Sequence, residues 1–301
     1  MKENKIISYK GFDKNMKCRG FQYEVGKEYE MDGEIKCCKQ GFHACKSPME
    51  VWDYYDMLSS RYAEVEQSGK IDKEEYSTKV CSSCIKIKAE LKLADIINIG
   101  VEWLKDITSP SKVKADGMLN DNGDRKKQIG SSGDYAQIGS SGYSAQIGSS
   151  GYSAKIGSSG YSAQIGSSGY SAKIGSSGYS AKIGSSGDYA QIGSSGYSAK
   201  IGSSGDSAKI GSSGDSAKIG SSGDSAQIDS TGEDSVIMCA GNSSRAKAKV
   251  GSWITLAEWK WSYEKKRDVP VCVKTEYVDG ENIKADTWYQ LKDGKFVEVD
   301  E

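Results

Sequence analysis

The sequence has little of what most catalytic or membrane-spanning proteins need. Its 301 residues include one histidine and three prolines, and no apolar run approaches the length of a membrane span, which takes about 20 apolar residues. The first residues, MKENKIISYKGF, also lack the apolar core of a signal peptide. We therefore predict a cytoplasmic protein with no membrane partner.

Positive charge and catalytic motifs are equally sparse. Lysine and arginine number 40 against 41 aspartates and glutamates. The chain therefore lacks the positive excess that neutralises nucleic acids, and we do not expect it to bind them. No Walker loop, G-x-S-x-G or H-E-x-x-H motif is present, and we expect no cofactor. The eight cysteines should be reduced in a cytosol.

What the chain has in abundance is a nine-residue repeat. Each unit reads Gly-Ser-Ser-Gly, then Tyr or Asp, then Ser-Ala-Lys/Gln-Ile. Ala and Ile lie two positions apart, which places both on one face of a strand, whereas Gly-Ser-Ser-Gly is typical of a turn. Two glycines in every nine residues exclude a helix. Isoleucine recurs at Ile129, Ile138, Ile147, Ile156, Ile165, Ile174, Ile183, Ile192, Ile201, Ile210, Ile219, Ile228 and Ile237.

Strand-turn units of fixed length stack into a β-solenoid, in which each coil covers the apolar face of the one below. The smallest sensible coil holds two units, and a triangular coil of three units is the alternative. A two-unit coil aligns tyrosines in one column, and stacked aromatics stabilise such columns, so we favour it. The aligned tyrosines are Tyr143, Tyr161, Tyr179 and Tyr197.

A metal site in the repeat is not expected. Calcium-binding nonapeptides carry an aspartate in every turn and a single apolar residue per unit, whereas fewer than half of these units have an aspartate. We interpret the repeat as a scaffold or spacer that occupies residues 128–237. The predicted fold is mainly β: this solenoid, an N-terminal α/β domain over residues 1–108, a linker over residues 109–127, and a small β cap over residues 238–301.

The N-terminal segment predicts both strands and helices. IISYKGF, FQYEV, RYAEVE and KVCSSCIKIKAEL have strand-like patterns. A first helix should begin after Ser47, because Pro48 suits the first turn and Glu50 completes a capping box. A second helix is predicted over LADIINIGVEWLKDI, which places its apolar residues on one face.

The C-terminal segment should cover the last coil, because an uncovered end would expose the isoleucine row. Trp253, Ile254, Leu256 and Trp259 are bulky enough for this role. TWYQLKDGKFVEV predicts a β-hairpin that turns at Asp293-Gly294.

The cysteines near the only histidine offer one metal hypothesis. Two close pairs of Cys or His ligands are typical of structural zinc, and the candidate ligands are Cys37, Cys45, Cys81 and Cys84. Against this, Cys81-Ser-Ser-Cys84 lies in a strand-like run, where residues three apart point to opposite faces. We therefore favour reduced, unmetallated cysteines. A catalytic pair of Cys45 and His43 is a weaker alternative.

Several motifs together resemble one family. YKGFDKNMKCRGFQYEVGKEYE, GFHAC and RYAEVE precede the IGSSG nonapeptides, and GSWITLAEW follows them. This order resembles uncharacterised proteins of phages and gut Firmicutes that join such an N-terminal domain to a nonapeptide array. The resemblance implies a phage or prophage setting, the host cytoplasm and contact with host machinery, including defence proteins, but no activity.

The N-terminal domain alone also resembles the motif order of ADP-ribosyltransferases. Those enzymes have an aromatic or basic residue before a glycine, a central strand followed by a helix, and a late catalytic glutamate. The matching residues here are Tyr9, His43, Glu64 and Glu66, but the central Ser-Thr-Ser element is absent. A diverged enzyme of this class is the alternative to our leading prediction.

The leading prediction is a non-enzymatic binding or scaffold protein with a protein partner. A uniform repeat makes a periodic surface that suits another extended object, including a second copy of the same rod. A monomer whose repeat only separates the flanking domains is the alternative. We place the interaction surface at Tyr143, Tyr161, Tyr179, Tyr197, Trp253, Trp259 and Trp261.

Overall fold

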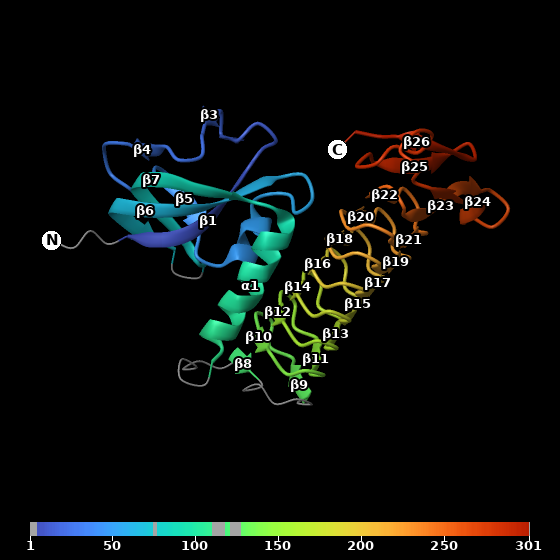
Figure 1. The fold of residues 1–301 in the computed structure, drawn as a ribbon, viewed down its shortest axis with the longest axis horizontal. Coiled ribbons are helices and arrows are strands. Elements are labelled where there is room, and N and C mark those ends of the chain that lie inside the picture. The colour runs from blue at the N-terminus through green and yellow to red at the C-terminus, as the bar shows by residue number, and fades with distance from the viewer. Residues whose placement is uncertain (1–4, 75–76, 110–117, 121–127, 301) are drawn as a thin grey trace. The chain divides into compact units, whose positions relative to one another are not determined.

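The computed structural model describes residues 5–74, 77–109, 118–120 and 128–300. The protein is mainly β and divides into two compact units, Met1–Trp103 and Leu104–Glu301 (Figure 1). In the part of the chain that is described, no helix is both long and apolar enough to cross a membrane. The predicted fold class is confirmed, with corrections in both flanking segments.

Four strands of the N-terminal unit form a closed ring. Strand β6 pairs with both β1 and β7, and β5 pairs with the other edges of the same two strands. Large apolar side chains, among them Phe12, Phe42 and Ile85, fill its core. The elements are β1 (Ile6–Phe12), β2 (Lys17–Cys18), β3 (Phe21–Gln22), β4 (Glu28–Glu30), β5 (Phe42–Cys45), η1 (Pro48–Asp53), β6 (Arg61–Lys73), β7 (Lys79–Leu91) and α1 (Leu93–Ile107).

Three of the predicted strands and the second helix are confirmed, the predicted strand FQYEV is reduced to Phe21–Gln22, and the first helix is wrong in type and capping. It is a single 3-10 segment, η1, and the Ser47 side chain caps nothing. Glu50 instead accepts hydrogen bonds from the backbone and hydroxyl of Thr78, at 2.9 and 3.0 Å. This tertiary partner replaces the local capping box. With one α-helix against seven strands among its described residues, the unit is a β domain rather than α/β.

The repeat forms the predicted solenoid with two units per coil and about seven turns. Ile147 pairs with Ile165 in a parallel register of 18 residues, and the same offset recurs along the rod, so the triangular alternative is wrong. Alternate units enter a ten-stranded and a nine-stranded sheet (Figure 1). Ile and Ala side chains point inward, as expected, and stack on their equivalents in the next coil.

The strands of the rod are short and regular. The first, β8 (Met118–Asn120), lies inside the predicted linker, whose residues 110–117 and 121–127 lie outside the described part of the chain. The others are β9 (Gln128–Ser131), β10 (Gln137–Ser140), β11 (Gln146–Ser149), β12 (Lys155–Ser158), β13 (Gln164–Ser167), β14 (Lys173–Ser176), β15 (Lys182–Ser185), β16 (Gln191–Ser194), β17 (Lys200–Ser203), β18 (Lys209–Ser212), β19 (Lys218–Ser221), β20 (Gln227–Ser230), β21 (Val236–Cys239) and β22 (Arg245–Ala248).

Tyrosines stack along both turn edges of the rod, as far as Tyr189 on one edge and Tyr197 on the other. The predicted column from Tyr143 to Tyr197 is confirmed, with neighbouring ring centroids 5.0–5.1 Å apart. A second column joins Tyr152 to Tyr170 at 5.2 Å and Tyr170 to Tyr189 at 5.1 Å. This spacing matches the ~4.8 Å between strands, so each ring rests on the one in the next coil.

The turns change conformation halfway along the rod. Up to Ser180, the residue after the variable position donates its N–H to the preceding coil, as Ser162 does to the Tyr143 carbonyl at 2.8 Å. From Tyr189 onward this residue has a positive φ of 52–56° and donates to the following coil, as Ser207 does to the Asp224 carbonyl. The peptide bond before this residue therefore has opposite orientations in the two halves of the rod.

Aspartates at the variable position accompany the flipped turns. Asp188 accepts the backbone N–H of Asp206 through Oδ1 at 2.9 Å, and Asp206 accepts that of Asp224 at 2.8 Å. The ladder continues to Asn242. A carboxylate thus satisfies the backbone donor of the next coil, and this bond offsets the cost of a left-handed residue.

The C-terminal segment closes the rod with two hairpins. Ile254 and Leu256 stack inward on the last repeat strand as predicted, but Trp253 points outward and is 47% exposed, so its predicted capping role is wrong. Val278 and Tyr289, with their neighbours, cover the end of the core instead. The predicted Asp293-Gly294 turn is confirmed, since both residues have positive φ. The strands are β23 (Trp253–Ser262), β24 (Arg267–Tyr277), β25 (Tyr289–Lys292) and β26 (Lys295–Glu298).

Candidate functional site

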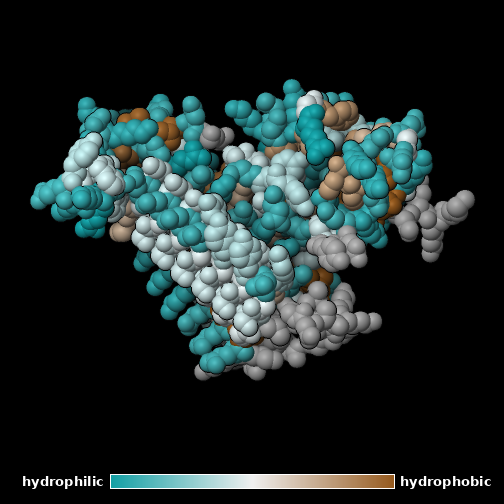
Figure 2. Space-filling model, turned by 180° about the vertical axis from the view of Figure 1, so that it is seen from behind, coloured by the Kyte–Doolittle hydropathy of each residue, from teal (hydrophilic) through white to brown (hydrophobic). Residues whose placement is uncertain are grey.

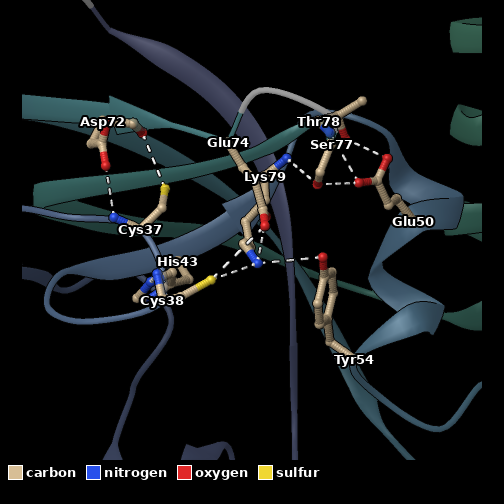
Figure 3. A network of polar contacts seen from close by, with 10 residues as sticks. All are labelled: Cys37, Cys38, His43, Glu50, Tyr54, Asp72, Glu74, Ser77, Thr78 and Lys79. Carbon is tan, nitrogen blue, oxygen red and sulfur yellow. Dashed lines mark hydrogen bonds and ion pairs between the residues drawn. The ribbon is translucent and has the colours of Figure 1, made fainter.

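A polar network in the N-terminal unit centres on Lys79, at the start of β7 (Figure 3). Its Nζ lies 2.6 Å from Glu74 Oε2, 3.2 Å from Cys38 Sγ and 4.8 Å from the centroid of the Tyr54 ring. Burial lowers the pKa of Lys79, but the hydrogen bonds to Glu74 and Cys38 outweigh it and hold the pKa above its ordinary value. Lys79 is therefore a fixed cation that ties three segments together.

His43 is held as a neutral acceptor in this network. Its Nε2 accepts the backbone N–H of Cys38 at 3.0 Å (Figure 3). Burial, and then the charges of Lys10 and Arg19, lower the pKa of the imidazole. A ring nitrogen that accepts from the backbone is not available to take a proton from a substrate, so His43, which the enzymatic alternatives would use as a catalytic residue, makes a structural contact.

The four candidate zinc ligands do not converge. Cys37 and Cys81 contact each other, and each thiol also donates to a backbone carbonyl, at 3.5 and 3.1 Å. Burial raises the pKa of both thiols, that of Cys81 to about 12, which favours the protonated form. Cys45 lies opposite Lys79, and Cys84 opposite Glu30. Among the residues that the structure describes, no three His, Cys, Asp or Glu side chains form a group suited to a metal ion.

The residues of the ADP-ribosyltransferase alternative are only partly brought together. Tyr9 and Glu64 are direct neighbours on β1 and β6, but Glu66 lies two positions further along β6. Glu64 lies 3.1 Å from Lys88, and Glu66 lies 2.9 Å from Lys5. His43 lies on β5 with its ring turned to Cys38. Both carboxylates are therefore committed to surface ion pairs.

The outer face of the nine-stranded sheet offers a second candidate. Alternate residues of each strand point outward, so the face carries two parallel rows. One row, called the ridge below, is Gln128, Gln146, Gln164, Lys182, Lys200 and Lys218, and the other, called the trough, is Gly130, Gly148, Gly166, Gly184, Gly202 and Gly220. Together they line an open groove of about 910 Å³ that follows six coils.

The trough glycines differ from the turn glycines of the same repeat. A Cβ added to Gly184 or Gly202 would meet nothing within 4 Å, and neither residue has a positive φ. A Cβ added to the turn residue Gly196 would lie 1.9 Å from the Gly178 carbonyl oxygen. The fold thus requires glycine in the turns but not in the trough, where it leaves the backbone open to close approach.

Charge on this face is separated into two rows in the same coils. Lys182, Lys200 and Lys218 are exposed and make no ion pair within the described residues. The aspartate row, Asp188, Asp206 and Asp224, lies at the turn that follows each of these strands, beyond the trough. The three lysines therefore stand ~4.8 Å apart with no carboxylate beside them.

The face ends in apolar and aromatic side chains. Val236 continues the ridge and Met238 the trough, and they are 47% and 54% exposed. Trp253 follows on β23, where its ring lies 5.0 Å from that of Tyr277 on the edge strand β24. In Figure 2 the rod shows long pale rows bordered by a row of strongly hydrophilic residues. Such rows form because equivalent residues of successive repeats lie directly above one another.

The predicted interaction residues fall into separate places. Tyr143, Tyr161, Tyr179 and Tyr197 form one exposed column, Trp253 lies on the outer face, and Trp261 is exposed further along β23. Trp259 is partly buried and donates its Nε1–H to the Ala240 carbonyl at 2.8 Å. The sequence also predicts Lys/Gln rows on the sheet faces, but the ridge lysines were not among the predicted interaction residues. The signal was present, because every second unit from Gln128 reads Gln three times and then Lys three times.

Comparison with known proteins supplies no activity. Residues 6–99 match a family model described as a domain of unknown function, DUF7666. No curated protein and no solved structure matches the chain. The chain therefore joins a DUF7666 domain to a repeat region that forms a solenoid.

Proposed function

We propose that this is a non-enzymatic binding protein in which the solenoid is a rigid scaffold and the outer face of the nine-stranded sheet is the binding surface. The observation that carries the proposal is the open groove along six coils, with amide and ammonium groups on one side and bare backbone on its floor. Glycine in a strand costs stability, so a glycine row that the fold does not need supports a role in close contact.

The resemblance to phage and gut Firmicutes proteins supports a phage setting for this binding. In that setting the protein would act in the host cytoplasm, and a partner among host proteins would bind the face or a flanking domain. Among the described residues, the candidate acid and base groups of the enzymatic alternative are held in ion pairs and a backbone hydrogen bond, which supports the binding role.

Substitution of the trough tests the proposal. Gly184→Thr with Gly202→Thr should leave the free energy of unfolding unchanged or raise it, because threonine suits a strand, while a partner captured by the wild type from host lysate should be lost. The matched control, Ser159→Thr with Ser177→Thr, changes turn residues next to the other sheet and should keep that partner. A marked loss of stability in the trough variant would show that the glycines serve the fold, and would overturn the proposal.

A further inference from the structure

The outer face has a shape that fits its own copy. The ridge stands on one side of the face and the trough lies beside it, two residues or about 6.6 Å away along the strand. Rotation of a second rod by 180° about an axis parallel to the rod places its ridge over the first trough and its trough over the first ridge. Rods that run in opposite directions would instead bring ridge against ridge.

The charges on the face agree with this arrangement. In three coils the ridge carries Lys182, Lys200 or Lys218, and in those same coils the turn beyond the trough carries Asp188, Asp206 or Asp224. Within one rod the trough keeps lysine and aspartate apart. In the parallel pair, a lysine that lies in the partner's trough faces the aspartate row of the partner in the same coil.

The repeat distributes lysine and aspartate as this contact requires. Lysine stands in the ridge only where the following turn has aspartate, and Gln146 and Gln164 stand where that turn has tyrosine; the first coil, with Gln128 and Asp134, is the exception. In the ten-stranded sheet lysine also stands before tyrosine, since Lys155 precedes Tyr161 and Lys173 precedes Tyr179. Matching between residues that do not touch within one chain indicates a contact between chains.

We propose, building on the function proposed above, that the occupant of the outer face is a second copy of this chain, parallel to the first and related to it by a two-fold axis along the rod. Eight strands about 4.8 Å apart and about four residues wide give roughly 500 Å² per protomer, or about 1,000 Å² in total, the lower limit for a specific interface. The exposed Val236, Met238 and Trp253 then supply its apolar end.

Sedimentation of the full chain tests the proposal. The wild type should be a dimer at tens of micromolar. Lys182→Gln with Lys200→Gln and Lys218→Gln should weaken the dimer about tenfold without unfolding it, because Gln128, Gln146 and Gln164 already occupy the ridge. The control, Lys155→Gln with Lys173→Gln and Lys209→Gln, removes the same charge from the other sheet and should leave the dimer intact. Equal weakening in both variants would contradict the contact.

Single cysteines fix the direction of the two rods. Gln146→Cys and Lys200→Cys, each introduced alone, should both give a covalent dimer with a short bis-maleimide cross-linker, because a parallel two-fold places every ridge position in the same coil as its own copy, across the width of ridge and trough and so beyond the reach of a direct disulfide. The wild type treated with the same reagent controls for its native cysteines. Cross-linking at neither position would overturn the arrangement. A monomeric wild type would contradict the dimer. The proposed binding face would still be supported if the trough variant lost the partner that the wild type captures from host lysate.

Discussion

The turns in the two halves of the solenoid differ in backbone conformation and in the contacts that hold them. Up to Ser180, the residue after the variable position does not have a positive φ, and tyrosine rings stack on the outside of these turns. From Tyr189 the same residue is left-handed, and aspartate carboxylates bond to the next coil. In both halves the turn N–H has a carbonyl acceptor, in the preceding coil up to Ser180 and in the following coil from Tyr189 to Ser225, and the aspartate carboxylates of the second half add side-chain acceptors.

The local sequence does not decide which of the two turn conformations forms. Gly178–Lys182 and Gly196–Lys200 both read GYSAK, yet only Ser198 has a positive φ. Ser198 donates to the carbonyl of Asp215 in the following coil, whereas Ser180 donates to Tyr161 in the preceding one. The conformation of a turn therefore follows that of its neighbours, and one flip propagates along the rod.

Turn glycines should show the largest effect, and the same effect in both halves. Gly160→Ala places a Cβ 2.1 Å from the Gly142 carbonyl oxygen, and Gly214→Ala places one 2.0 Å from that of Gly196. Such overpacking should cost about 3 kcal/mol of the free energy of unfolding, measured by urea titration. The control Gly202→Ala meets nothing and should be neutral or slightly stabilising. Unequal losses of unfolding free energy in the two halves would mean that their turns differ by more than the orientation of one peptide bond.

The aspartate ladder should matter next, and only in the second half. Asp206→Ala removes the acceptor of the Asp224 N–H, which lies 2.8 Å away, and should cost about 1 kcal/mol. Asp206→Asn keeps an acceptor and should retain most of the stability. Hydrogen exchange at the Asp224 amide gives a local measurement. Unchanged protection in the alanine variant would show that the carboxylate is not the acceptor that holds this turn.

The regular part of the fold was predictable because its signals are local and repeated. The strand period, the turn glycines and the two-unit coil all follow from nine residues. The closed ring of the N-terminal unit was not, because β6 and β7 pair with strands far away in sequence. The role of Glu50 was also missed, since its partner Thr78 lies 28 residues away. The contact of His43 was not predictable for the same reason, because only the folded loop places the Cys38 N–H at its ring.

Serine-to-glycine substitutions should affect stability differently in the two halves. Ser162 does not have a positive φ, so Ser162→Gly only adds chain entropy to the unfolded state and should cost about 1 kcal/mol. Ser207 has a φ of 55°, so Ser207→Gly also relieves a left-handed conformation and should be neutral or stabilise by about 0.5 kcal/mol. Thermal unfolding of both variants measures the difference. Equal losses would contradict the flipped turn.

The tyrosine column should have the smallest effect on stability. Asp occupies the variable position in several coils, so Tyr161→Asp with Tyr179→Asp should leave the rod folded, as circular dichroism would show. The column borders the outer face on its ridge side, because each of these turns leads into a ridge strand. In the parallel pair this border lies beside the second turn edge of the partner, which carries Tyr170 and Asp188 in those coils. New carboxylates there should repel Asp188 and raise the dimer dissociation constant, though less than loss of the three ridge lysines. Sedimentation of this variant beside the ridge variant ranks the two effects, and a larger effect of the tyrosine variant would move the centre of the contact from the face to the turn edge.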